Sequence, residues 1–318
     1  MRKTAKNSFF QWIRDPAALA TLTMIVIWLL SMFVFPGFRT LKHNITLLQT
    51  GSFLGLIAAG QAMVVLTGGM DMSVSSIVTL SSFALSSAIQ HGMSSFTGIV
   101  LALGMSMFIG FLNATGINFL RISPIIMTIA MMSIIEGALL VFTQGTPPSG
   151  CGDIIEFLSS GTPLGIPNSI LFWMLILLLF VWITGKTKYG RHIYAVGANE
   201  KAAVLSGVNV KMVKYIVYIA SGLCSGLAGI MLLGNLGSTT ITLGTPYQMY
   251  SVSSVVVGGI AITGGKGKYW GVVAGTIIVI LLRDILNVTR ISAAGKELFQ
   301  GLLILLVLFA YGREKKNA

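Results

Sequence analysis

The chain has 318 residues, of which 54% are hydrophobic and only 9% are charged; its mean hydropathy is +0.86. Soluble domains carry roughly 25% charged residues, so this composition excludes a soluble globular protein and predicts an all-α, polytopic membrane protein surrounded by lipid. The net charge of +12 is typical of basic cytoplasmic loops in such proteins, and we expect no nucleic acid partner. Two cysteines, Cys151 and Cys224, exclude a Cys-rich metal site.

Apolar runs of about 20 residues, the length that crosses the hydrocarbon core of a bilayer, follow one another along the whole chain. Because they leave only short connections, we predict one transmembrane domain over 1–318 with about ten helices. The runs cover 17–35, 46–67, 73–90, 96–119, 122–144, 168–184, 212–233, 247–264, 270–288 and 297–311. The run 247–264 is rich in Gly and Ser, and we expect it to be partly broken or re-entrant.

The basic residues predict how the chain is oriented. Cytoplasmic segments of membrane proteins carry an excess of Lys and Arg. If both termini are cytoplasmic, most Lys and Arg lie on the cytoplasmic side, in the N-terminus 1–16, the short cytoplasmic loops, the long connection 185–211 and the tail 312–318. The opposite side keeps Arg39, Lys42, Arg283, Arg290 and Lys296. The segment 145–167 is then an external loop, which we expect to contain a short interfacial helix.

Motifs for enzymatic chemistry are missing from the sequence. The nearest approach to a phosphate-binding loop, Gly264-Gly265-Lys266-Gly267, lacks both the first Gly and the final Ser/Thr of that motif. No H-E-x-x-H occurs, and the three histidines are scattered over predicted loops. We therefore expect no catalytic residue, no metal site and no cofactor bound by this chain, and we predict that it is not an enzyme.

The connection 185–211 carries signals for a short helix. Asn199 is a good N-cap, Ala202 and Ala203 favour helix, and Gly207 suits the left-handed stop. Such a segment is either a solvated loop or a docking element for a cytoplasmic partner, with a small exposed face formed by Ala202, Ala203 and Ser206.

Five motifs occur in a recognisable order. They are Thr67-Gly68-Gly69-Met70-Asp71-Met72-Ser73-Val74; Gly110-x-Leu112-Asn113; Ile122-x-Pro124-Ile125-Ile126-x-Thr128; the run from Tyr194 to Val210 followed by Tyr218-x-x-Ser221-Gly222-Leu223; and Val255-Val256-Val257-Gly258-Gly259 with Gly264-Gly265-Lys266-Gly267 and Gly271. From about residue 45 to the C-terminus this order resembles the permease subunits of ribose/arabinose-type ABC importers, a type II-like importer architecture.

The resemblance implies a permease that moves a sugar or sugar-like solute across the inner membrane by alternating access. It also implies a second permease copy or a related permease, an external solute-binding protein, and cytoplasmic ATPase subunits that use ATP and Mg²⁺. In this sequence the implied coupling residues are Gly197, Asn199, Glu200, Ala202, Ala203, Ser206 and Gly207.

Candidate residues of the translocation pathway or its gate are polar groups and glycines within the predicted spans. They are Gln61, Gly68, Gly69, Asp71, Asn113, Glu136, Ser253 and Ser254. Asp71 lies in a Gly-rich break where it can cap the following helix, act in a hinge or gate, or contact sugar. The uncharged groups can bind sugar hydroxyls or hold helices together.

Glu136 departs from the resemblance, because the related permeases commonly have Arg at this place. A carboxylate at membrane depth must be paired, protonated or exposed to water. An ion-coupled secondary transporter that uses Asp71 and Glu136 is therefore the alternative function.

Overall fold

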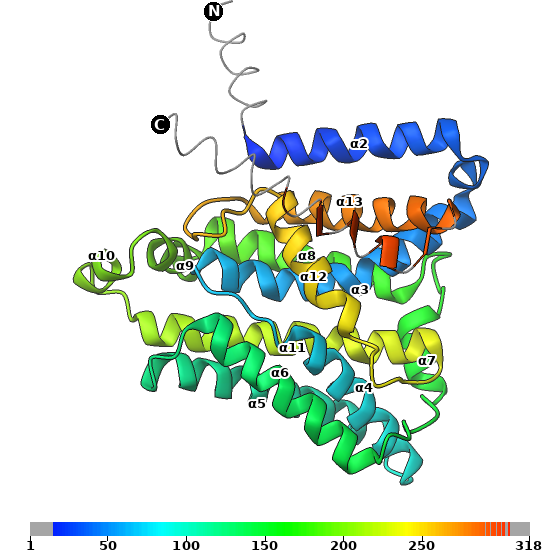
Figure 1. Ribbon diagram of the computed structural model, residues 1–318, viewed down its shortest axis with the longest axis horizontal. Helices are drawn as coiled ribbons and strands as arrows, with labels where there is room; N and C mark the ends of the chain where they lie inside the picture. The colour runs from blue at the N-terminus through cyan, green and yellow to red at the C-terminus, as the bar shows by residue number, and fades with distance from the viewer. Residues whose placement is uncertain are drawn as a thin grey trace, which may run out of the picture.

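The computed structural model describes residues 15–289, 291–292, 294–296, 298–299, 301–302 and 305. Over these residues it is a bundle of helices without strands (Figure 1). The elements are α2 (Pro16–Val34), the 3-10 helix η1 (Pro36–Arg39), α3 (Leu41–Leu66), α4 (Val74–Gln90), α5 (Ser95–Phe119), α6 (Pro124–Thr143), α7 (Asp153–Ser160), α8 (Asn168–Lys186), α9 (Lys188–Ala198), α10 (Glu200–Leu205), α11 (Val210–Leu236), α12 (Thr245–Val257) and α13 (Tyr269–Val288).

The helix starts follow local capping chemistry. Asp15 accepts a hydrogen bond from the backbone of Ala17 at 3.2 Å, and Ser94 accepts one from Thr97 at 3.1 Å, so each satisfies an amide that the helix itself leaves free. Proline occupies the first position of α2 and α6, where its missing N–H costs nothing. The first nine predicted runs all coincide with helices, and α7 is the short helix expected in 145–167.

The prediction of ten spans is not confirmed. Seven helices are long and apolar enough to cross a membrane in the part of the chain that the structure describes. Helices α4, with 17 residues, and α12, with 13, are shorter, and the run 297–311 falls mostly outside the described residues. The expected break in 247–264 is present because Gly259 has φ +89°, a conformation that ends helix α12.

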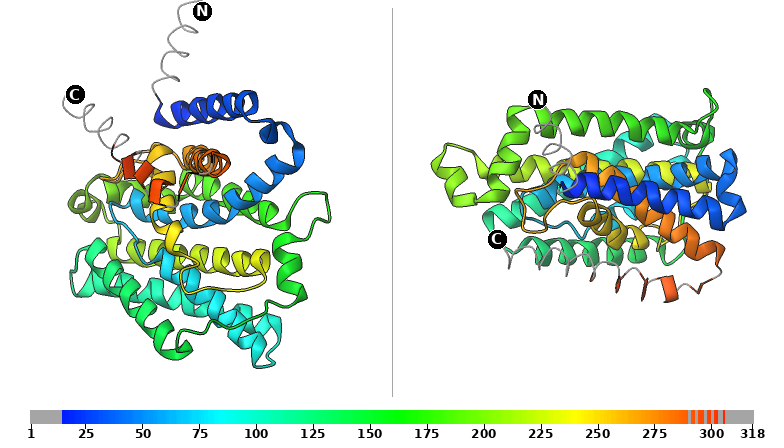
Figure 2. Two further views of the ribbon diagram at one scale, coloured as in Figure 1. Left: turned by 45° about the vertical axis from the view of Figure 1, so that its right-hand side comes forward. Right: turned by 90° about the horizontal axis from the view of Figure 1, so that it is seen from above.

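Helices α3 and α11 form the buried centre of the bundle. Helix α11 packs against α3, α4 and α5, and small residues allow the close approach. A Cβ at Gly60 would lie 2.7 Å from the Cα atom of Ser221, and one at Gly110 would lie 2.9 Å from the Cα atom of Ile219. Helix α2 instead lies at the edge of the bundle beside α13 (Figure 2).

Two short helices begin near the middle of the bundle rather than at its ends (Figure 1). The chain runs back from the end of α3 to Asp71, which bonds to Ser221, about halfway along α11. The segment between α11 and α12 returns in the same manner, and Gly244 donates its N–H to Thr79 Oγ1 in α4 at 3.1 Å. Helices α4 and α12 therefore start close together inside the bundle.

The connections sort to two ends of the bundle, with α9 and α10 at one end and α7 at the other (Figure 1). Near α10 lie the α5–α6 turn and the start of α11, which share one cavity with it. At the α7 end, Ser149 pairs with Ser238, and His43 of α3 contacts Asp284 of α13. This alternation agrees with the loop assignment made from the basic residues, while the sidedness itself stays a prediction.

Candidate functional site

Asp71 is the centre of a buried polar cluster. Its side chain is fully buried; Oδ1 accepts from the backbone N–H of Ser73 at 3.0 Å and from its hydroxyl at 2.6 Å, while Oδ2 accepts from Ser221 Oγ at 2.8 Å. Asn113 of α5 donates its Nδ2 proton to Ser73 Oγ at 2.9 Å. One carboxylate thus fixes the turn that leads into α4 and joins it to α11 and, through Ser73, to α5.

Thr128 of α6 holds the other side of the same break. Its Oγ1 accepts the N–H of Met72 at 3.0 Å and lies 3.3 Å from Met70 O, while its nearest carbonyl acceptor is Pro124 O at 2.9 Å. The unwound residues 70–72 are therefore fixed from two directions. Asn113 Oδ1 and the hydroxyl of Tyr218 are buried nearby without a hydrogen-bond partner among the described residues.

This geometry bears on the roles left open for Asp71. Asp71 bonds to Ser73, the N-cap residue of α4, without capping the helix itself, and its bond to Ser221 adds a link between distant elements. Because the carboxylate is fully enclosed, it does not face a solute pathway in this conformation. A hinge or gate role remains a prediction for Asp71 and Asn113.

Three backbone segments meet without side chains between them at the α10 end. Gly265 donates its N–H to Leu66 O at 2.9 Å. A Cβ at Gly197 would lie 2.5 Å from Gly265 N, and one at Gly264 would lie 2.6 Å from Gly68 N. We call this contact between residues 66–68, 197–198 and 264–265 the glycine junction. It links the end of α9 to the non-helical segment that leads to Asp71.

The predicted helix in 185–211 is present as α10. Asn199 Oδ1 accepts the N–H of Ala202 at 3.0 Å, and Gly207 has φ +81°, as expected for a cap and a left-handed stop. Glu200 binds Lys214 Nζ through both carboxylate oxygens at 2.9 Å, which attaches α10 to α11. The sequence did not reveal α9, because two glycines and several polar residues made that segment resemble a loop.

One part of the exposed-face prediction is wrong. Ala203 is only 3% exposed, because it packs into the cluster that includes Val196 and Val210. Ala202 and Ser206 are exposed as expected. The most exposed apolar side chain of α10 is Leu205, at 89%.

The remaining polar candidates are not part of the Asp71 cluster. Gln61 is fully buried in α3, and both of its side-chain polar atoms lack a partner within the described part of the chain. Ser253 and Ser254 donate to the carbonyls of Met249 and Tyr250 one turn earlier, at 2.7 and 2.8 Å. The two serine hydroxyls are therefore satisfied within α12.

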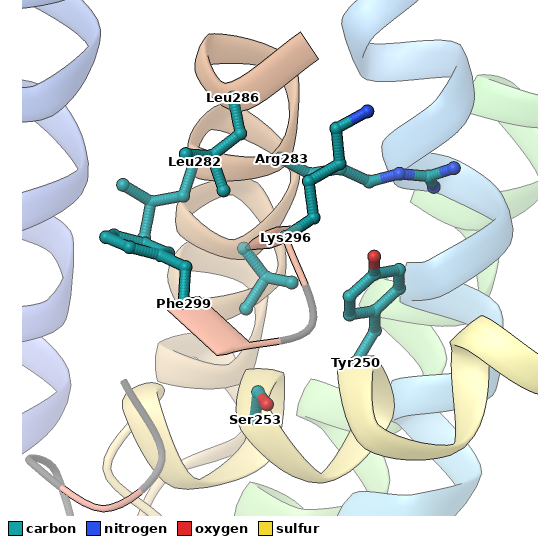
Figure 3. A pocket seen from close by; sticks show the side chains of 8 residues that line it. Tyr250, Ser253, Leu282, Arg283, Leu286, Lys296 and Phe299 are labelled. Atoms are coloured by element: carbon teal, nitrogen blue, oxygen red, sulfur yellow. The ribbon is translucent and has the colours of Figure 1, made fainter. Parts of the chain in front are cut away.

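Ser253 nevertheless lines a small cavity of about 30 Å³ between α12, α13 and the segment that carries Lys296 (Figure 3). Arg283 lies over the ring of Tyr250, with 5.3 Å between Cζ and the ring centroid. Sequence reasoning had placed Arg283 and Lys296 on the outer side and missed this cavity, since their contacts depend on how α12 packs.

Glu136 lies half-buried on α6, one turn after Met132. Met132 contacts the amide of Gln248 on α12, with Nε2 at 3.3 Å from its sulfur. Glu136 has no ion-pair partner among the described residues. Glu136 therefore shares no hydrogen-bond or ion-pair partner with Asp71 among the described residues.

The described residues thus form a helical bundle of the polytopic membrane class, with seven helices of spanning length, two short helices and a buried carboxylate near the glycine junction. Residues 44–308 match the family model described as "Branched-chain amino acid transport system / permease component", and the chain belongs to this family. It is similar to the ribose import permease protein RbsC of Bacillus subtilis strain 168, with 33% identity over 289 residues, covering 90% of each chain.

Two further relatives extend the comparison. The RbsC protein of Escherichia coli K12 is 30% identical over 308 residues, covering 96% of this chain and 95% of the relative. The fructose import permease protein FrcC of Rhizobium meliloti is 28% identical over 317 residues, covering 96% and 88% respectively. The chain is therefore a membrane permease component of a transport system and not an enzyme, the relatives named above are import permeases for ribose and fructose, and the ion-coupled alternative is not supported.

Proposed function

We propose that this chain is the membrane permease of an importer that carries a monosaccharide across the inner membrane by alternating access. The chain holds no cofactor of its own, and ATP with Mg²⁺ is used by a separate cytoplasmic ATPase. An external solute-binding protein delivers the sugar, and two permease chains form the complex. The similarity to ribose and fructose import permeases over nearly the whole chain supports the sugar class.

The glycine junction carries the proposed coupling mechanism. Helix α10 docks on the ATPase through its exposed face, where Leu205 and Ala202 lie. Its partner α9 contacts the backbone of residues 66–68, so a displacement of α9 is passed to Gly68 and Gly69. That segment continues to Asp71, whose bonds to Ser73 and Ser221 hold α4 against α11. Nucleotide-driven closure of the ATPase would thereby shift the start of α4.

A reconstituted transport assay tests this function. The permease, its ATPase and its binding protein are placed in proteoliposomes, and ATP-driven uptake is measured for pentoses, hexoses and branched-chain amino acids. We expect saturable uptake of one sugar. Uptake of an amino acid instead would overturn the sugar assignment, and uptake by a proton gradient without the ATPase would overturn the whole proposal.

The docking face is tested in the same vesicles. Leu205→Glu and Ala202→Glu place a charge on the exposed face of α10, and we expect each to lower ATP-driven uptake at least tenfold with normal permease yield. Ala203→Glu is unsuitable as a docking variant because it buries a charge. Leu164→Glu, at an exposed position of the loop after α7 at the opposite end of the bundle, serves as the control for added charge and should leave ATPase binding intact.

A further inference from the structure

The connection between α12 and α13 is bonded to helix α9 as well as to the end of α3. We call residues 258–268 the α12–α13 loop. Gly265 belongs to the glycine junction, where its N–H bonds to Leu66 O. Two residues further on, Gly267 O accepts the hydroxyl proton of Tyr194, a residue of α9, at 2.8 Å. A displacement of α9 therefore reaches this loop through a side chain as well as through the glycine junction.

The α12–α13 loop is folded back on itself, so that it can pass a displacement on to α12. The N–H of Ala261 donates to Lys266 O at 3.0 Å, and Ala261 O accepts from the N–H of Gly264 at 2.9 Å. A Cβ at Gly267 would lie 2.6 Å from the Cα atom of Ile260. Because Ile260 comes directly after the glycines that end α12, Gly267 lies against the end of that helix.

At its other end, α12 is in close contact with α4. Gly244 donates its N–H to Thr79 Oγ1, and a Cβ at Gly244 would lie 2.7 Å from the carbonyl carbon of Ser75. In the segment that enters α12, Thr239 Oγ1 lies 2.6 Å from Ser82 Oγ of α4. Backbone here meets backbone without a side chain that could adjust, so a shift of α4 alone would break the contact.

We infer that α4 and α12 move as one unit during transport, and that Tyr194 is the positioning residue that connects α9 to the α12 end of this unit. The glycine junction drives the start of α4, while the α12–α13 loop drives the end of α12. Hydrogen bonds and rigid elements of this kind carry coupling between distant sites. The inference rests on the proposed function, because it extends the same coupling from α4 to α12.

Helix α9 offers a matched control for Tyr194. The hydroxyl of Tyr189 donates to Val213 O of α11 at 3.1 Å. Burial raises the pKa of both tyrosines, so both hydroxyls stay protonated and remain donors at neutral pH. Tyr189→Phe and Tyr194→Phe therefore each remove one hydrogen bond from α9 to a backbone carbonyl. They differ in the element from which α9 is released, which is α11 in one case and the α12–α13 loop in the other.

The first test measures sugar uptake and ATP hydrolysis together in proteoliposomes that contain the permease, its ATPase and its binding protein. We expect Tyr194→Phe to lower the turnover number of uptake several-fold, with the KM for sugar and the rate of ATP hydrolysis within twofold of wild type. Tyr189→Phe should keep the wild-type ratio of sugar to ATP. A merely structural role of Tyr194 would lower yield, uptake and hydrolysis together and leave this ratio unchanged.

Two results would overturn the role of Tyr194: a wild-type ratio of sugar to ATP in Tyr194→Phe, or an equal fall of the ratio in Tyr189→Phe. A wild-type complex that hydrolyses ATP but takes up no sugar would instead overturn the proposed function. The wild-type measurement therefore separates the two failures.

The second test links α4 to its neighbours by disulfide bonds, whose formation is checked by the loss of free thiol. Oxidation of Ser82→Cys with Thr239→Cys ties α4 to the segment that enters α12, and we expect uptake to stay within twofold of the reduced protein. Oxidation of Ser73→Cys with Asn113→Cys ties the start of α4 to α5 instead, and uptake should be lost until the bond is reduced.

The contrast between the two disulfide pairs decides whether α4 and α12 move together. Loss of uptake on oxidation of the Ser82→Cys, Thr239→Cys pair, with recovery on reduction, would show that α4 and α12 separate and would overturn the single unit. Unchanged uptake in both oxidised pairs would show that α4 does not move, which also overturns the inference.

Discussion

Asp71 connects residues that are far apart in the sequence. Its bond to the N–H of Ser73 was foreseeable, because an Asp side chain commonly accepts from the backbone N–H two residues later, as in an Asx-turn. The bond to Ser221 was not, since it joins residues 150 positions apart and depends on how α11 packs against the break. The sequence therefore predicts the local bond of Asp71 to Ser73, but it does not predict the long-range bond to Ser221.

Replacing the Asp71 carboxyl group by an amide should destabilise the permease. Both carboxyl oxygens of Asp71 accept hydrogen bonds. In Asp71→Asn an NH₂ group replaces one of these oxygens, so one donor loses its acceptor. We expect the free energy of unfolding to fall by about 1–3 kcal/mol. The measurement is the thermal transition of the purified protein in detergent. Ser253→Ala, which removes a hydrogen bond made only within α12, is the control. An equal shift of the thermal transition in both variants would contradict a larger contribution of the Asp71 cluster to stability.

Glu136 is the second acid at membrane depth, and its prediction is separate. It is half-buried without an ion-pair partner in the described residues, which makes it a candidate for contact with a water-filled pathway. If it lines the pathway, Glu136→Gln should change the rate of ATP-driven uptake at least threefold at normal yield. Ile134→Ala, at an exposed position on the same helix, is the control. Unchanged uptake in Glu136→Gln would remove the residue from the pathway.

At the scale of elements, helix positions were predictable and helix depths were not. Apolar runs locate α2, α3, α5, α6, α8, α11 and α13 because each must satisfy its backbone within the bilayer. Helices α4 and α12 begin inside the bundle, a depth set by contacts such as that of Gly244 with Thr79. Likewise, Ala203 faces inward because α10 is attached to α11, which composition alone does not reveal.

The glycine junction gives a prediction for the coupling elements. A methyl group at Gly197 would clash with Leu66 O and with Gly265 N, so Gly197→Ala must push α9 away from the end of α3. We expect ATP-driven uptake to fall at least tenfold while the ATPase still binds. Gly185→Ala is the matched control, because a Cβ there meets nothing within 4 Å and an alanine favours helix α8. Equal uptake in the two variants would contradict transmission through the junction.

At the scale of the whole molecule, two long helices each precede a returning segment and a short helix. The pairs α3–α4 and α11–α12 run in opposite directions along the bundle (Figure 1). The sequences of these two pairs show no convincing repeat. Packing constrains only the small residues at helix contacts, and the apolar residues between them can vary. The common order of long helix, returning segment and short helix is therefore visible only in the structure.

The orientation of the whole bundle can be tested by labelling single introduced thiols. Leu205→Cys at the α10 end and Leu164→Cys near α7 are both at highly exposed positions. If the α10 end is cytoplasmic, a membrane-impermeant maleimide should label only Leu164→Cys in intact cells, and both after lysis. The reverse pattern would invert the orientation.

The native thiols provide a low background for this experiment. Cys151 and Cys224 are both buried, and burial, followed by the charges of Glu156 and Asp153, raises the pKa of Cys151 above its ordinary value. A raised pKa leaves less reactive thiolate at neutral pH. Labelling of the wild-type chain should therefore be slow at pH 7 and increase as the pH rises.

The short helices α4 and α12 also have a consequence for biogenesis. With 17 and 13 residues, and with their starts inside the bundle, neither one matches an independent insertion unit of about 20 apolar residues. Their unwound leading segments carry backbone groups that lipid cannot satisfy, whereas α11 and α4 supply partners for them. The translocon must therefore release these two helices together with later spans, so that α4 becomes stably embedded only after α11, more than a hundred residues downstream, has been synthesised.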